Sequence, residues 1–130
     1  MKLCRRRGTD DALRPIPQSL VSAAKQLFGL SRMPDEQVQR STVFRCADRR
    51  VMLCTYGANL PCGKADTNRH PRGVAAWCQE NPDADFVPNV ARPWGSIYDW
   101  RCVAGAAEIV RQVEEIDPRG FVNRYWKPLQ

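Results

Sequence analysis

The sequence lacks several features that identify a protein class at once. None of its six cysteines stands in a Cys-x-x-Cys pair, although structural zinc sites are usually built from such pairs. No apolar stretch approaches the roughly 18 to 20 residues that a membrane-spanning helix needs. A nucleophile elbow, a phosphate-binding loop and a dinucleotide fingerprint are also missing. These absences favour a small soluble domain without a familiar catalytic motif.

The start of the chain lacks the apolar segment of an export signal. Residues 1–7 have the positive charge of a signal peptide's first region, but polar residues 8–11 follow. Either an export signal precedes this start, or the protein is cytosolic and its thiols are reduced. We favour the first alternative, because disulfides persist in oxidising compartments. The predicted location is therefore periplasmic or secreted.

Acidic residues are few in the first part of the chain. Residues 1–50 hold eleven Lys or Arg against five Asp or Glu, giving +6, whereas residues 51–130 hold nine of each. A basic arm can bind phosphate or anionic lipid, but terminal segments are more often solvated. We expect residues 1–17 to be a flexible basic leader and residues 18–130 to form a single domain.

Hydrophobic periodicity divides the domain into helices and strands. Helical spacing predicts an amphipathic helix that ends at Gly29, a further turn after Pro34 and a short helix ending at Asn81. Alternation predicts strands in the ranges 42–46, 51–56, 98–102, 108–116 and 121–126. The last three would form an antiparallel meander. The predicted fold class is α+β, with an antiparallel sheet of about five strands and two or three helices.

The six cysteines constrain the fold most strongly. They stand at Cys4, Cys46, Cys54, Cys62, Cys78 and Cys102. This spread spacing is typical of a disulfide framework. Phe44-Arg45-Cys46 echoes Trp100-Arg101-Cys102, so we prefer a Cys46–Cys102 bridge, with Cys62–Cys78 as the second pair. Cys54 would then be free or joined to Cys4.

Several short motifs resemble an uncharacterised family of small exported bacterial proteins. The motifs are Phe44-Arg45-Cys46, residues 57–66 (GANLPCGKAD), Ala76-Trp77-Cys78, residues 81–86 (NPDADF), residues 98–102 (YDWRC), Gly120-Phe121 and residues 126–129 (WKPL). The resemblance implies export and fold, and it implies no activity. An aromatic-x-Cys strand that leads into a hairpin is also similar to small periplasmic inhibitors of C-type lysozyme.

Metal ligation is an alternative use of the same side chains. Cys46, Cys54, Cys62, His70 and Cys78 recur every eight residues, and zinc accepts such donors. Because they form no local ligand pair, we expect no metal and no cofactor. A cytosolic zinc-stabilised protein whose basic arm contacts nucleic acid is the alternative.

Catalytic pairings are few because His70 is the only histidine. Cys62 or Cys78 would have to be the nucleophile, with Asp66 or Asn68 orienting the imidazole. Two acid pairs, more typical of turns and exposed charge, are Asp83 with Asp85 and Glu114 with Glu115. We expect no enzyme, and a small cysteine- or carboxylate-dependent hydrolase is the catalytic alternative.

An exposed aromatic residue offers a function without catalysis. Trp94 follows Arg92-Pro93 and precedes Gly95, which predicts a loop position. A loop tryptophan beside an arginine suits recognition of a protein, peptide or glycan, and a structural role covering the sheet is the other interpretation. The predicted function is a non-enzymatic extracytoplasmic binding or inhibitor-like module, with Trp94 and Arg92 as binding candidates. We expect no membrane span and no nucleic-acid partner.

Overall fold

The computed structural model describes residues 2–57 and 62–129. The chain divides into two compact units, which we call unit 1 (Met1–Gly63 and Asn123–Gln130) and unit 2 (Lys64–Val122). A single domain over residues 18–130 stays a prediction. Each unit has its own cluster of buried apolar side chains and at least one disulfide of its own.

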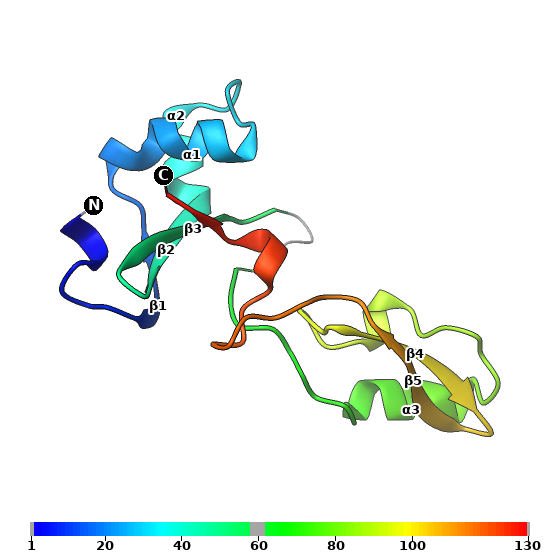
Figure 1. The fold of residues 1–130 in the computed structure, drawn as a ribbon. Coiled ribbons are helices and arrows are strands. Elements are labelled where there is room, and N and C mark those ends of the chain that lie inside the picture. The colour runs from blue at the N-terminus through cyan, green and yellow to red at the C-terminus, as the bar shows by residue number, and fades with distance from the viewer. Residues whose placement is uncertain (1, 58–61, 130) are drawn as a thin grey trace. The chain divides into compact units, whose positions relative to one another are not determined.

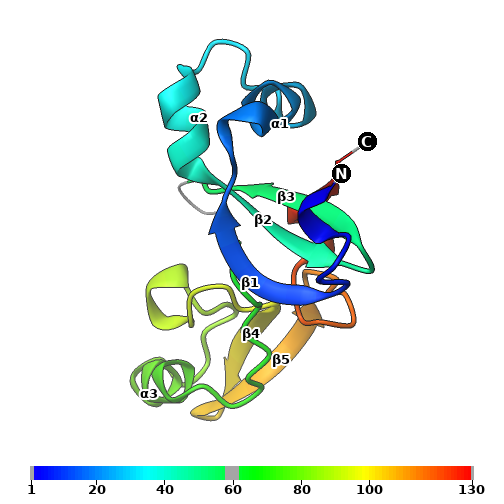
Figure 2. The ribbon, with the colours of Figure 1, turned by 90° about the vertical axis from the view of Figure 1, so that its left-hand side faces the viewer.

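Unit 1 contains a four-stranded antiparallel sheet in the order β1-β2-β3-β6 (Figure 1). Its strands are β1 (Asp10–Pro15), β2 (Thr42–Ala47), β3 (Arg50–Thr55) and β6 (Lys127–Pro128). Helices α1 (Val21–Phe28) and α2 (Asp35–Ser41) pack beside one another at one end of this sheet (Figure 2). Three single turns of 3-10 helix, Lys2–Cys4, Gln18–Leu20 and Asn123–Tyr125, complete the unit.

Turn residues explain where the elements of unit 1 end. Helix α1 stops at Gly29, whose φ of 67° is the left-handed conformation that glycine adopts at helix ends. Ala47 lies opposite Arg50, so Asp48 and Arg49 alone connect β2 to β3, and both have positive φ. A two-residue hairpin turn of type I′ requires positive φ at both of its central residues. The predicted helix and the two predicted strands are therefore confirmed.

The first seventeen residues belong to unit 1 rather than to a flexible leader. Strand β1 pairs with β2, and Ile16 is buried in the core with Phe44 and Leu53. Cys4 is also buried, in a disulfide with Cys46. The basic composition concealed this, because an edge strand needs only a few inward-facing side chains and tolerates charge.

Unit 2 contains a two-stranded antiparallel sheet packed against one helix. Strands β4 (Tyr98–Val103) and β5 (Ala106–Gln112) form a hairpin, and helix α3 (Arg72–Glu80) packs against both (Figure 1). The buried residues between them are Val74, Cys78, Val87, Ile97, Tyr98, Trp100 and Cys102. A 3-10 turn, Asn89–Ala91, precedes β4. No described helix is long and apolar enough to cross a membrane.

The predicted C-terminal meander does not form as a third strand beside β5. The turn at Asp117 is present, with the Gly120 N–H donating to the Asp117 carbonyl oxygen at 3.0 Å. Beyond it, Val122 makes only an isolated bridge with Ile116. The 3-10 turn Asn123–Tyr125 follows, and only then does β6 pair with β3. The α+β class, antiparallel pairing and disulfide stabilisation are confirmed.

Three disulfides join all six cysteines. They are Cys4–Cys46, Cys54–Cys62 and Cys78–Cys102. The preferred pairs Cys46–Cys102 and Cys62–Cys78 are therefore wrong. In each wrong pair the cysteines belong to different units, whereas each observed disulfide lies within one unit. The similar aromatic-Arg-Cys sequences each lie in the first strand of a hairpin. The cysteine of each hairpin is joined to another segment of its own unit, Cys46 to Cys4 and Cys102 to Cys78.

Candidate functional site

A groove on unit 2 is the best candidate binding site. Its volume is about 440 Å³, and three segments of unit 2 line it. The lining residues are Asp85, Phe86, Val87, Pro88, Asn89, Arg92, Asp99, Trp100, Val110 and Arg111. All of them lie among the described residues of one unit, so the groove is complete within unit 2.

One wall of the groove is the extended segment that follows α3. Pro82 prevents the helix from continuing, and the chain then runs back along β4. The Val87 N–H donates to the Trp100 carbonyl oxygen at 3.0 Å, and the Cys102 N–H donates to the Ala84 carbonyl oxygen at 2.8 Å. Val87 is buried by this pairing, whereas Phe86, its neighbour, is 69% exposed. The segment thus presents a large aromatic side chain to solvent.

The other wall is a β-bulge in β5. Asp99 pairs with Arg111 and Trp100 pairs with Ile109, so Val110 is an extra residue between two regular pairs. A bulge changes the direction of the side chains beside it. Val110 lines the groove and is 51% exposed. Two exposed apolar side chains, Phe86 and Val110, therefore belong to one groove.

Three of the four charged side chains that line the groove are paired with one another. Arg92 Nη1 donates to Asp99 Oδ1 at 3.0 Å, and Arg111 Nε donates to Asp99 Oδ2 at 3.1 Å. Arg92 also donates to the Tyr98 carbonyl oxygen, and its guanidinium lies 5.7 Å from the centre of the Trp100 ring. Its side chain is only 16% exposed. Arg92 therefore fixes the loop before β4 against that strand. Arg111 is largely exposed and so is accessible to a partner.

The two binding candidates from the sequence have different positions. Arg92 lines the groove. Trp94 is not among the lining residues, but it is 66% exposed, so it does not cover the core of the unit. Val110 was missed because a bulge register cannot be read from one strand alone. The only signal for Phe86 was an aromatic residue in a loop after a helix stop.

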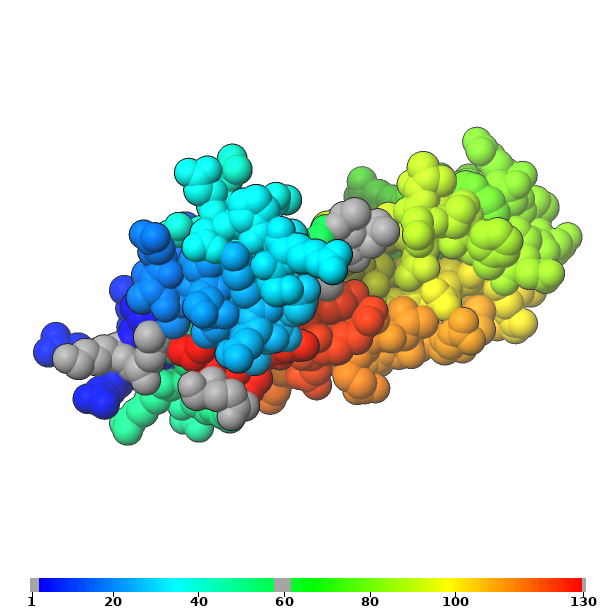
Figure 3. Space-filling view, turned by 90° about the horizontal axis from the view of Figure 1, so that it is seen from above, coloured from blue at the N-terminus to red at the C-terminus, as the bar shows by residue number. Residues whose placement is uncertain are grey.

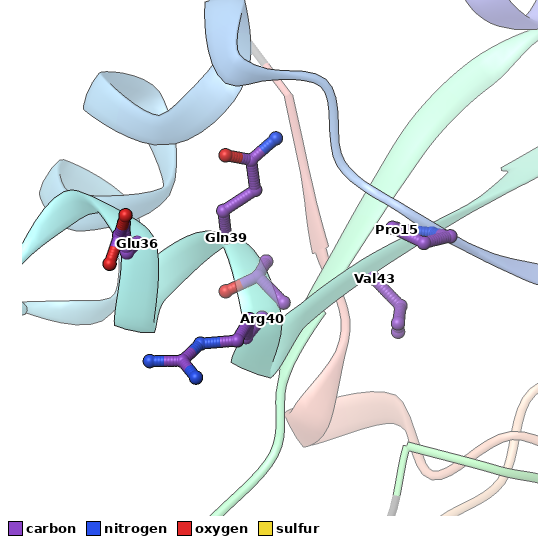
Figure 4. A pocket seen from close by; sticks show the side chains of 6 residues that line it. Pro15, Glu36, Gln39, Arg40 and Val43 are labelled. Atoms are coloured by element: carbon purple, nitrogen blue, oxygen red, sulfur yellow. The ribbon is translucent and has the colours of Figure 1, made fainter.

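A second hollow lies on unit 1 and is less suited to a partner (Figure 4). Its volume is about 570 Å³, and it is lined by Pro15, Glu36, Gln39, Arg40, Thr42 and Val43. Gln39 points from α2 toward the chain that follows Pro15, where its Nε2 donates to the Ile16 carbonyl oxygen at 3.2 Å. None of these lining residues is aromatic, and the only large apolar side chain, Val43, is half-buried. This hollow therefore lacks an exposed aromatic side chain of the kind that Phe86 provides in the groove of unit 2.

The disulfides use the sulfur atoms that a metal or nucleophile would need. No described cysteine is free, so neither Cys62 nor Cys78 offers a thiol to His70. Among residues 2–57 and 62–129, no group of three or more His, Cys, Asp or Glu could hold a metal ion. The zinc alternative and the cysteine hydrolase therefore lose their essential donors.

Three of the remaining catalytic candidates, Asp66, Asn68 and Asp83, accept hydrogen bonds that stabilise turns. Asp66 Oδ1 accepts the Asn68 N–H at 2.8 Å, and Asn68 Oδ1 accepts the His70 N–H at 2.9 Å, which stabilises successive turns. His70 itself is exposed. Asp83 Oδ1 accepts the Ala104 N–H at 3.4 Å and so stabilises the β4–β5 turn.

No protein-family model, curated protein or solved structure matches the chain. The resemblance to small exported bacterial proteins therefore stays a prediction. Part of its longest motif, residues 58–61, lies outside the described residues.

Proposed function

We propose that this protein is a non-enzymatic, extracytoplasmic binding module with an inhibitor-like mode of action. The groove of unit 2 binds an extended segment of another protein, and an apolar side chain of that segment lies between Phe86 and Val110. Three disulfides support a place in an oxidising compartment. The motifs that resemble exported bacterial proteins support the same location.

The observation that carries this proposal is the exposure of Phe86 and Val110 on one groove. A soluble unit gains nothing by holding a large aromatic side chain in water, so such residues often mark binding surfaces. The groove also has the composition of a binding site, because apolar walls surround a few polar groups in fixed positions. Arg92 and Asp99 are already paired, so a partner need not order them on binding.

Phe86→Ala is expected to weaken binding at this groove without unfolding the protein. A displayed library of random peptides is selected on the oxidised protein, and enriched peptides should share an apolar anchor residue. Truncating a central aromatic side chain at an interface costs about 1 to 3 kcal/mol, or roughly 5- to 150-fold in Kd. Fluorescence anisotropy of the labelled peptides measures Kd for each variant.

Val90→Ala is the matched control for this experiment. Val90 is even more exposed than Phe86, lies four residues away in the same segment, and does not line the groove. Its substitution should leave Kd within about twofold, as surface changes generally do. Equal peptide binding by Phe86→Ala and the unaltered protein would overturn the proposal, as would a selection that enriches no common anchor.

A further inference from the structure

Two basic turns that are distant in the sequence lie side by side at one end of unit 1. The N-terminal turn carries Arg5, Arg6 and Arg7, and the β2–β3 turn carries Arg49 and Arg50. All five side chains are exposed. Figures 2 and 3 show the N-terminal turn in dark blue next to the blue-green hairpin. We call these five residues the arginine cluster.

Covalent and hydrogen bonds hold the two turns together. The Cys4–Cys46 disulfide joins the segments just before the arginines of each turn. The Arg49 N–H donates to the Gly8 carbonyl oxygen at 2.7 Å, and the Asp48 N–H donates to Thr9 Oγ1 at 3.0 Å. The arginine cluster is therefore one fixed surface of the folded unit rather than a mobile tail.

Nearby acidic groups do not neutralise the arginine cluster. Asp48 is an exposed carboxylate within it. Asp10 Oδ2 accepts a hydrogen bond from Arg14 at 3.0 Å and lies 4.0 Å from Arg7 Nη1. The Ala12 N–H and the Arg14 guanidinium donate hydrogen bonds to Asp10 and lower its pKa. This carboxylate is therefore charged and already accepts hydrogen bonds from residues outside the cluster. Five exposed guanidinium groups thus lie near the carboxylates of Asp48 and Asp10.

We propose that the arginine cluster is a docking surface for an anionic phospholipid bilayer. Guanidinium groups bind phosphate oxygens with two parallel hydrogen bonds, and a lipid surface offers many phosphates at once. Clustered Lys and Arg residues each add about fivefold to the affinity for such a surface. Attachment of this kind needs only a charged surface on unit 1 and no spanning helix.

The surroundings of the cluster favour a lipid surface over nucleic acid. Proteins that bind single strands stack the bases on exposed aromatic side chains. In the described part of unit 1, the exposed large apolar residue is Tyr56. It follows the last residue of β3, whereas the hairpin turn precedes the first residue of that strand. A compartment that preserves disulfides also keeps the protein away from cellular nucleic acid. Duplex DNA also presents many phosphates, so the experiment must distinguish binding to duplex DNA from binding to lipid.

Cosedimentation of the oxidised full chain with vesicles tests this docking surface. The protein should bind vesicles of phosphatidylcholine that contain about 30% phosphatidylglycerol, and not vesicles of phosphatidylcholine alone. Binding should disappear at about 0.5 M salt because charges on exposed groups are screened. Arg49→Asn with Arg50→Gln should lower the partition coefficient about 25-fold, and Arg5→Gln with Arg6→Gln should do the same. Asn at position 49 tolerates the positive φ found there.

A charge-matched variant, Arg32→Gln with Arg72→Gln, is the control. Both residues are exposed and lie outside the arginine cluster, so the partition coefficient should change less than about threefold. Circular dichroism of each variant confirms that the fold is kept. An equal loss in the control would overturn the proposal, since net charge alone would then explain binding. Binding to duplex DNA but not to anionic vesicles would overturn it as well.

Discussion

Unit 2 is expected to unfold at room temperature when Cys78 and Cys102 are both replaced by alanine. This disulfide closes a loop with a sequence separation of 24, and the chain-entropy account gives it about 3.5 kcal/mol. A core as small as that of unit 2 rarely supplies more than about 3 to 5 kcal/mol by itself. The loss is therefore comparable to the whole stability of the unit.

Hydrogen exchange followed by mass spectrometry measures this effect in each unit separately. Amides of residues 72–112 should lose their protection in the Cys78→Ala, Cys102→Ala variant. The control removes Cys54 and Cys62, which belong to unit 1 and whose sequence separation is 8, worth about 2.5 kcal/mol in the same account. In the control, protection in unit 2 should persist. Unchanged protection of unit 2 in the first variant would contradict its dependence on the disulfide.

Trp100→Ala is expected to lower the free energy of unfolding of unit 2 by about 3 to 5 kcal/mol. Trp100 is 1% exposed and belongs to the buried cluster of unit 2, with its ring centre 5.8 Å from that of Tyr98 in an edge-to-face arrangement. Its removal leaves a large cavity and takes away the ring beside the Arg92 guanidinium. The groove that Trp100 lines should be lost with it.

Trp94→Ala is the matched control, since it removes the same side chain from an exposed position. Trp94 is 66% exposed, so its loss should change stability by no more than about 0.5 kcal/mol. Urea denaturation followed by hydrogen exchange gives the free energy for both variants. If both substitutions destabilise unit 2 equally, the assignment of Trp100 to the core and Trp94 to the surface is wrong.

The parts of the fold that could be predicted depend on local physics. Helix α1 follows from apolar residues at helical spacing, and its end follows from Gly29, which adopts the left-handed conformation easily. The β2–β3 hairpin follows from two alternating segments separated by a polar turn. In each case neighbouring residues carry the whole signal.

The parts that could not be predicted depend on distant residues. Strand β1 has the sequence DDALRP, which shows no clear alternation, and only its pairing with β2 makes it a strand. Disulfide pairing likewise depends on which segments meet in space, so sequence spacing could not show that Cys4 joins Cys46. Residues 1–17 were assigned to a leader because neither the strand pairing of β1 nor the partner of Cys4 can be read from the neighbouring residues.

The candidate site shows the same division. Arg92 was found because an arginine stands in an aromatic loop, although its main partners, Asp99 and Trp100, come from β4. Val110 could not be found, because its exposure depends on the register between β4 and β5 rather than on its neighbours in the sequence. The arginine cluster also depends on two turns that only the fold brings together.

Disulfide mapping tests most directly the claim that three bridges within two units hold this fold together. Proteolysis of the unreduced, alkylated protein followed by mass spectrometry should give three linked peptide pairs and no alkylated cysteine. The links should be Cys4–Cys46, Cys54–Cys62 and Cys78–Cys102. Six alkylated thiols in the native protein, or a link between Cys46 and Cys102, would contradict the account.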